Sequence, residues 1–87
     1  MTNLSNLSME DLKKHWAKDA AKHLVGRKIV KVRYLKEDET EDLMWSNAPL
    51  IIFFDDGSYI YPSSDDEGND GGALFTSHSD LSVIPVI

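Results

Sequence analysis

Apolar residues recur at helical spacing near the start of the chain. Between residues 8 and 25 the apolar side chains follow one another three or four positions apart, and they are Met9, Leu12, Trp16, Ala20 and Leu24. This spacing places them on one face of an α-helix. Ser8 is a suitable N-cap, because a serine hydroxyl can accept a hydrogen bond from a backbone N–H of the first turn. Gly26 suits the C-terminal cap. The pattern predicts an amphipathic helix over residues 8–25.

The remaining residues, 28–87, have the pattern of β-structure. Apolar and basic side chains alternate from 27 to 35, which predicts a half-buried strand. The acidic stretch 37–45 predicts a short helical turn, because it ends in the apolar anchors Leu43 and Trp45. We expect short strands at 73–75 and 81–87 with a turn over 76–79, the last strand lying at an edge because Pro85 has no N–H to donate.

Residues 50–62 carry the clearest local signal, that of a β-hairpin. Two apolar runs, 50–54 and 59–61, flank a turn that contains Asp56 and Gly57. A two-residue type I′ turn suits this dipeptide, because both of its positions need a positive φ. The predicted register pairs Phe54 with Tyr59, Phe53 with Ile60 and Ile52 with Tyr61. Both faces of such a hairpin are apolar, so we expect it to be central and to leave one face for a partner, for example in a homodimer.

These elements predict a single domain over residues 1–87 of the α+β class. Its N-terminal helix is expected to pack on a small, strongly bent antiparallel sheet, or on an SH3-like β-barrel, of about five strands. A chain of this length has a small core, so both the helix and the sheet are needed to close it.

From Ile29 onward, about two-thirds of the chain, the sequence resembles a family of small bacterial proteins that have no assigned activity. The resemblance is carried by IVKVRYL, LIIFFDDGSYIYPS, DDEGNDGGALF and LSVIPVI, of which the DDEGND-x-GALF block is the most specific. Where such proteins usually have Leu-Gly-Trp, this chain has Leu43-Met44-Trp45, so methionine stands at the position of a turn glycine. The resemblance supports the fold and implies no mechanism.

Composition excludes several kinds of chemistry. The chain has no cysteine, which rules out disulfides, thiolate nucleophiles and cysteine-bound metals. A small domain without disulfide staples is typical of a reducing compartment, so we expect a cytoplasmic protein. The first residues lack the basic and apolar regions of a signal peptide. The longest apolar run, 50–54, is too short to span a membrane.

Charge is divided unevenly along the chain. All nine Lys and Arg lie between 13 and 36, and residues 1–36 hold only three acids, whereas residues 37–87 hold twelve acids and no base. A candidate basic face for nucleic acid consists of Lys14, Lys18, Lys22, Lys31 and Arg33. The net charge of −6 argues against nucleic-acid binding, because the acidic half repels phosphate. Two solvated surfaces of opposite sign are the simpler interpretation.

The acidic loop over residues 63–72 is the main candidate binding segment. Its candidate site residues are Asp65, Asp66, Glu67, Asn69 and Asp70. Carboxylate and amide oxygens are ligands for hard cations, but the calcium-loop pattern breaks because Thr76 stands where the bidentate acid belongs. Tight turns and side-chain-to-backbone hydrogen bonds explain these residue types better, so we assign no metal site and no cofactor. Recognition of a basic protein partner is the third interpretation.

No catalytic constellation is evident. Ser77, His78 and Asp80 are too close in the chain to converge on one centre, and the chain has no phosphate-binding loop. The sequence therefore favours a non-enzymatic binding or regulatory module that acts through protein contacts, with Trp45 as a candidate anchor for a partner. A nucleic-acid-associated module using the basic segment 13–36, and a divalent-cation-binding domain using the loop 65–70, are the alternatives.

Overall fold

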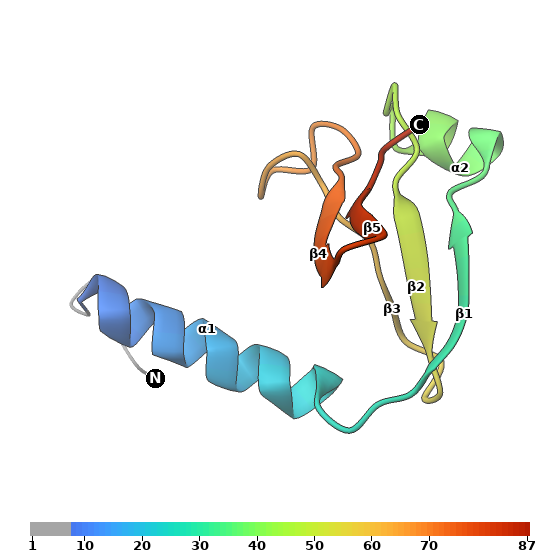
Figure 1. Cartoon of the computed structure of the whole chain (residues 1–87). Helices are drawn as coiled ribbons and strands as arrows, with labels where there is room; N and C mark the ends of the chain where they lie inside the picture. Colours follow the sequence, from blue (N-terminus) through green and yellow to red (C-terminus); the bar gives the residue numbers. More distant parts are fainter. Residues whose placement is uncertain (1–7) are drawn as a thin grey trace.

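The computed structural model describes residues 8–87 and has two antiparallel sheets and two helices (Figure 1). The elements in chain order are α1 (Met9–Leu24), β1 (Ile29–Tyr34), α2 (Glu37–Asp42), β2 (Leu50–Phe54), β3 (Tyr59–Ile60), β4 (Leu74–His78) and β5 (Leu81–Ile84). One sheet has the strand order β1-β2-β3, and the other is the β4-β5 hairpin. The α+β class and the order of elements are confirmed, and over residues 8–87 the sheets do not close into a barrel.

Helix α1 begins and ends as its sequence predicts. The Ser8 hydroxyl accepts a hydrogen bond from the backbone N–H of Asp11 at 3.1 Å, which is an N-cap. Glu10 and Asp11 lie in the first turn, where acids interact favourably with the helix dipole. After Leu24 the chain leaves the helix through Gly26, whose φ of +82° favours glycine. Within the described residues, no helix is long and apolar enough to cross a membrane.

The predicted packing of α1 on the sheet is wrong. None of its residues is buried, Trp16 is 57% exposed, and α1 projects away from both sheets in Figure 1. The segment after the helix explains this position. The Arg27 side chain donates from Nε to the His23 carbonyl at 3.4 Å and lies 3.3 Å from Asp56 Oδ2 at the tip of the β2–β3 hairpin. Arg27 thereby links the end of α1 to the end of the sheet.

The turn between β2 and β3 differs from the predicted type I′ turn. The backbone N–H of Phe54 donates to the Ser58 carbonyl at 2.9 Å, so three residues, 55–57, form the loop. Gly57 alone in this loop has a positive φ, of +87°. The Asp56 carboxylate instead accepts a hydrogen bond from Ser58 N at 3.0 Å. This arrangement is the three-residue hairpin loop with its last residue in the left-handed region.

The longer loop shifts the register by one residue. Phe53 pairs with Tyr59 and Ile52 pairs with Ile60, which replaces the predicted pairs of Phe54 with Tyr59 and Phe53 with Ile60. A shift of one residue moves side chains to the opposite face. Phe53 and Tyr59 therefore share one face of the sheet, and Ile52 and Ile60 share the other.

The β4–β5 hairpin lies beside the second of these faces. Leu74 of β4 lines a pocket with Ile52 and Ile60, and the Tyr34 hydroxyl donates to the Pro85 carbonyl at 2.8 Å. The predicted turn over 76–79 is wrong, because β4 continues to His78 and pairs it with Leu81. The Thr76 hydroxyl donates a hydrogen bond to the Leu81 carbonyl and so adds a contact between β4 and β5.

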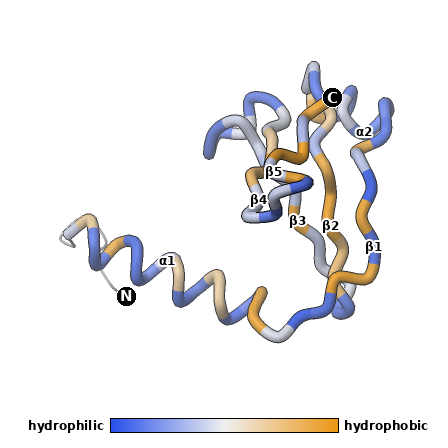
Figure 2. The backbone as a smooth tube through the Cα atoms, in the orientation of Figure 1, coloured by the Kyte–Doolittle hydropathy of each residue, from blue (hydrophilic) through white to orange (hydrophobic). Residues whose placement is uncertain are grey.

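The core is small and lies along β2. Among the described residues the buried hydrophobic side chains are Leu35, Ile51 and Phe54, and Pro49 is also fully buried. Figure 2 shows apolar residues, in orange, along β1, β2 and β5, although many of these side chains remain exposed. The sheets leave much of their apolar surface uncovered because α1 does not pack on them.

Met44 occupies a backbone conformation that favours glycine. Its φ is +59°, and it is the one non-glycine residue of 8–87 with a positive φ. The turn is closed by hydrogen bonds from Met44 N to the Glu41 carbonyl at 3.0 Å and from Trp45 N to the Thr40 carbonyl at 2.8 Å. The resemblance noted in the sequence predicts a glycine at this position.

We predict that Met44→Gly stabilises the protein by about 1 kcal/mol, because a left-handed conformation costs a residue with a Cβ about that much. The Met44 side chain is 88% exposed, so its removal sacrifices no packing. Urea unfolding followed by circular dichroism measures the change. Met44→Ala is the matched control and should bring no gain, because alanine keeps the Cβ; an equal gain from both variants would contradict the explanation.

Candidate functional site

Four aromatic side chains form a continuous row on one face of the three-stranded sheet. The ring centroids of Phe53 and Tyr59 are 5.9 Å apart, and those of Tyr59 and Tyr61 are 6.0 Å apart with the rings stacked. Tyr61 meets Trp45 edge-on at 5.7 Å. Tyr59 is 55% exposed and Tyr61 36%. We call these four residues the aromatic row; exposed aromatic rings in contact are typical of binding surfaces.

Two basic side chains of β1 lie over one end of the aromatic row. The Lys31 ammonium is 5.8 Å and the Arg33 guanidinium 5.3 Å from the Phe53 ring centroid, which are cation–π distances. They share this face because Lys31 pairs with Phe53 across the sheet, and Arg33 pairs with Ile51. This end of the row is therefore already occupied by cations of the chain itself.

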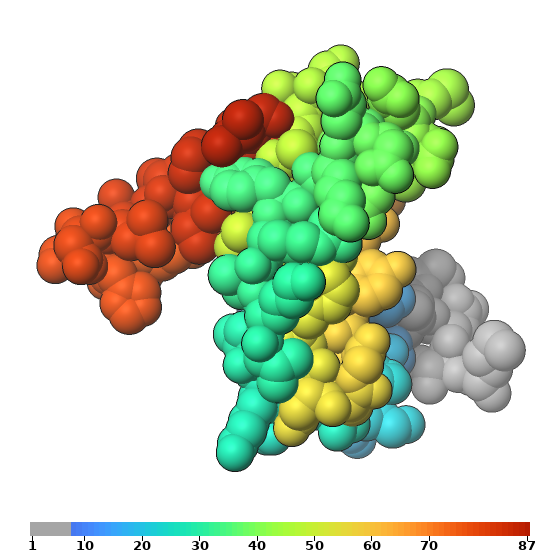
Figure 3. Space-filling view, turned by 90° about the vertical axis from the view of Figure 1, so that its right-hand side faces the viewer, coloured from blue at the N-terminus to red at the C-terminus, as the bar shows by residue number. Residues whose placement is uncertain are grey.

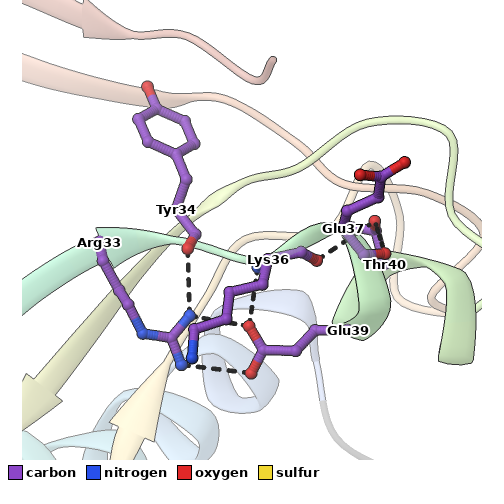
Figure 4. Close-up of polar contacts among 6 residues, drawn as sticks. All are labelled: Arg33, Tyr34, Lys36, Glu37, Glu39 and Thr40. Carbon is purple, nitrogen blue, oxygen red and sulfur yellow. Dashed lines mark hydrogen bonds and ion pairs between the residues drawn. The ribbon is translucent and has the colours of Figure 1, made fainter.

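Arg33 is held in place by Glu39 of α2 (Figure 4). The guanidinium donates two hydrogen bonds to the carboxylate, at 2.7 and 3.2 Å, and Lys36 N donates a third at 2.7 Å. The hydrogen bonds from Arg33 and from the Lys36 backbone lower the pKa of Glu39 to about 2. The hydrogen bond to Glu39 in turn raises the pKa of Arg33. The bidentate pair fixes α2 against β1.

A groove of about 280 Å³ lies between α2 and the aromatic row. Phe53, Tyr59 and Tyr61 line it, and Arg33, Glu39 and Asp42 add charged groups. Helix α2, with the sequence EDETED, has five acids and no base, so the α2 side of the groove is acidic. In Figure 3 the residues of β2 and β3, in yellow, are exposed beneath α2, in green.

In the acidic loop, the carboxylate of Asp65 forms a local turn. Its two oxygens accept hydrogen bonds from the backbone N–H of Glu67 at 3.0 Å and from the backbone and side-chain nitrogens of Asn69 at 3.2 and 2.8 Å. These bonds, with the Asn69 side chain contributing most, lower the pKa of Asp65. Asp65 and Asn69 therefore stabilise the loop itself.

Asp70 joins the acidic loop to the segment after α2. Its Oδ1 accepts hydrogen bonds from the backbone N–H groups of Gly71, Asn47 and Ser46 at 2.7, 3.0 and 3.1 Å. The bonds from Gly71 and Asn47 contribute most to lowering the pKa of Asp70. A Cβ on Gly71 would lie 2.5 Å from the Asn47 carbonyl oxygen, so glycine is needed for this close approach.

The aromatic row and the acidic loop are also joined directly. Trp45 donates a hydrogen bond from Nε1 to the Gly68 carbonyl at 2.7 Å, so its ring is held between the loop and Tyr61. Asp66 and Glu67 remain exposed on the loop. Within residues 8–87, no three His, Asp or Glu side chains are grouped so that they could hold a metal ion.

The candidate basic residues do not form one face. Lys14, Lys18 and Lys22 are exposed on α1, which projects from the body, whereas Lys31 and Arg33 lie over Phe53 on the sheet. The surface formed by Phe53, Tyr59 and Tyr61 was not predicted, because the predicted register placed Phe53 on the other face of the hairpin from the two tyrosines. A prediction of a three-residue loop over 55–57 would have placed Phe53 on the same face as the two tyrosines.

We predict that Asp70→Asn lowers the melting temperature by several degrees, because an amide cannot accept all the hydrogen bonds that the carboxylate accepts. Thermal unfolding followed by circular dichroism measures the change. Asp66→Asn is the matched control, since it removes the same charge from an exposed position in the same loop, and it should leave the melting temperature unchanged. If both variants lowered the melting temperature equally, the charge of the loop and not the hydrogen bonds of Asp70 would explain the change.

We predict that the Arg33–Glu39 pair makes stability depend on acidic pH. The pKa of Glu39 is about 2 in the folded protein, compared with 4.5 for a glutamate without these partners. Its contribution to the free energy of unfolding is therefore complete above pH 4.5 and is lost as the pH falls towards 2. The difference in melting temperature between wild type and Glu39→Gln should therefore be largest near neutral pH and shrink on acidification. If this difference in melting temperature stayed the same from about pH 2 to about pH 6, the result would contradict the role of this ion pair.

Comparison with known proteins adds no identification. A scan against models of protein families, a search of curated proteins and a search of solved structures each found no match. The resemblance to a family of small bacterial proteins therefore stays a prediction from the sequence.

Proposed function

We propose that this protein is a cytoplasmic binding module, not an enzyme, that recognises a basic segment of a partner protein on its aromatic row. The observation that carries the proposal is a row of contacting aromatic rings, of which Tyr59 and Tyr61 are exposed, beside an acidic helix. Aromatic side chains supply large contact areas with little loss of conformational freedom, and they are enriched among the residues that dominate binding energy.

The chemistry of the groove favours a lysine or arginine of the partner. The faces of Tyr59 and Tyr61 attract cations, and Asp42 adds a carboxylate at the same groove. Arg33 does not cancel this preference, because its charge is paired with Glu39. Phosphate, by contrast, would approach five acids of α2, which makes the proposal of a protein partner stronger than that of a nucleic acid.

The proposal assigns the acidic loop a supporting role. Asp65, Asn69 and Asp70 already use their polar atoms within the chain, and through Trp45 the loop supports one end of the aromatic row. Asp66 and Glu67 extend the negative field that attracts a basic partner, which affects the rate of association more than the affinity.

We predict that peptides selected from a random displayed library on the immobilised protein carry Lys or Arg beside apolar residues. Tyr59→Ala should weaken their binding at least about tenfold, because it removes the central ring of the row. Titration calorimetry measures the affinities.

Phe75→Ala is the matched control for this experiment, since Phe75 is 83% exposed on β4, outside the aromatic row, and should not affect binding. Equal affinities of Tyr59→Ala and Phe75→Ala for every selected peptide would refute the proposed surface. Binding of a single-stranded oligonucleotide that Tyr59→Ala abolishes would point to a nucleic-acid partner instead.

A further inference from the structure

The body of the molecule has an open apolar surface on the sheet face opposite Phe53 and Tyr59. Ile52 of β2, Ile60 of β3 and Leu74 of β4 line, with Tyr61 and Pro62, a pocket of about 140 Å³ that exposes almost no polar atoms. We call it the apolar pocket. An apolar cavity of about 150 Å³ can hold a benzene ring, so this open pocket of similar size can receive one ring of an indole side chain.

The apolar surface continues beyond the pocket. Val32 pairs with Ile52 and so lies on the same face, and it is 52% exposed, while Ile60 is 41% exposed. In Figure 3 the β4–β5 hairpin, orange to red, stands out from the upper part of the sheet and leaves the lower part of β1, in teal, uncovered. Exposed apolar surface of this extent, beside so small a core, indicates a site at which another apolar surface packs.

Helix α1 has the complementary surface. Its apolar residues lie on one side and are uncovered, with Trp16 at the middle of the helix and 57% exposed. At 1.5 Å per residue, its 16 residues are about 24 Å long, comparable with the 29 Å width of the molecule. Its four lysines and three acids give α1 a charge of +1, and the five basic and twelve acidic residues of 25–87 give the body −7, so the two attract.

The linker holds α1 away from the sheet of its own chain. Arg27 bonds both the His23 carbonyl at the helix end and the Asp56 carboxylate at the hairpin tip, and Asp55 N donates to the Lys28 carbonyl at 2.9 Å. In this arrangement no residue of α1 lines the apolar pocket of its own chain. A helix held outwards is instead available to a second copy, as in domain swapping.

From this geometry we infer that two copies form a twofold dimer in which α1 of each copy packs on the other, with Trp16 in the apolar pocket. The contact is made twice, so each needs to bury only about half of the 1,200–2,000 Å² that stable interfaces bury in total. Tyr61 of the aromatic row also lines the apolar pocket, whereas Phe53 and Tyr59 lie on the opposite face, so peptide binding at Tyr59 can be tested separately from the dimer.

Light scattering during gel filtration of the full chain tests the dimer. We expect wild type to have twice the 9.8 kDa mass of one chain and Trp16→Ala to raise the dissociation constant at least about 30-fold, the effect of losing a dominant interface residue. Lys18→Ala, an exposed helix residue off the apolar side, is the matched control and should keep the dimer. A wild-type mass of one chain at high concentration, or a Trp16→Ala dimer as tight as wild type, overturns the inference.

Mixing two defective variants separates a swapped dimer from other arrangements. Ile60→Glu places a charge in the apolar pocket but keeps an intact helix, whereas Trp16→Ala keeps an intact pocket. Each variant alone should be monomeric, and an equimolar mixture should form a dimer through one intact contact. Circular dichroism verifies that both variants are folded. A mixture that stays monomeric overturns the inference, as does Trp16 packed on its own chain, which would lower the stability of Trp16→Ala without changing its mass.

Discussion

The turn at residues 55–57 sets the pairing of the central strands, and the remaining surfaces depend on that pairing. Gly57 takes the left-handed conformation and the Asp56 carboxylate holds Ser58, so the loop closes with three residues. Because side chains alternate along a strand, this loop length decides which of them share a face. It gathers Phe53 with Tyr59 on one side and Ile52 with Ile60 on the other.

The two faces thereby acquire different chemistry. The face of Phe53 carries aromatic rings, two cations of β1 and the acids of α2, a combination that suits a charged ligand. The face of Ile52 carries aliphatic side chains and a dry pocket, which suits an apolar side chain. Tyr61 lines both the groove and the apolar pocket, so it joins the two faces.

The acidic loop shows how a motif that suggests a ligand can have a structural role. Its carboxylates accept backbone hydrogen bonds that would otherwise need water, and Gly71 allows the loop to approach the Asn47 carbonyl closely. The combination of Asp, Asn and Gly in DDEGNDGG follows from this geometry. Through Trp45 and Asp70 the loop keeps the end of the aromatic row in position.

The local features of this protein can be read from its amino-acid sequence. The limits of α1, its Ser8 cap, the order of seven elements and the hairpin position all follow from periodicity, capping and turn chemistry, which act over a few residues. The register of β3, the left-handed conformation of Met44 and the position of α1 became clear from the folded structure. A type I′ turn and a three-residue loop suit the same Asp-Gly pair, and the apolar side of α1 does not specify which surface covers it. These outcomes depend on contacts such as Arg27 with Asp56, which join residues distant in the chain and leave no periodic pattern in it.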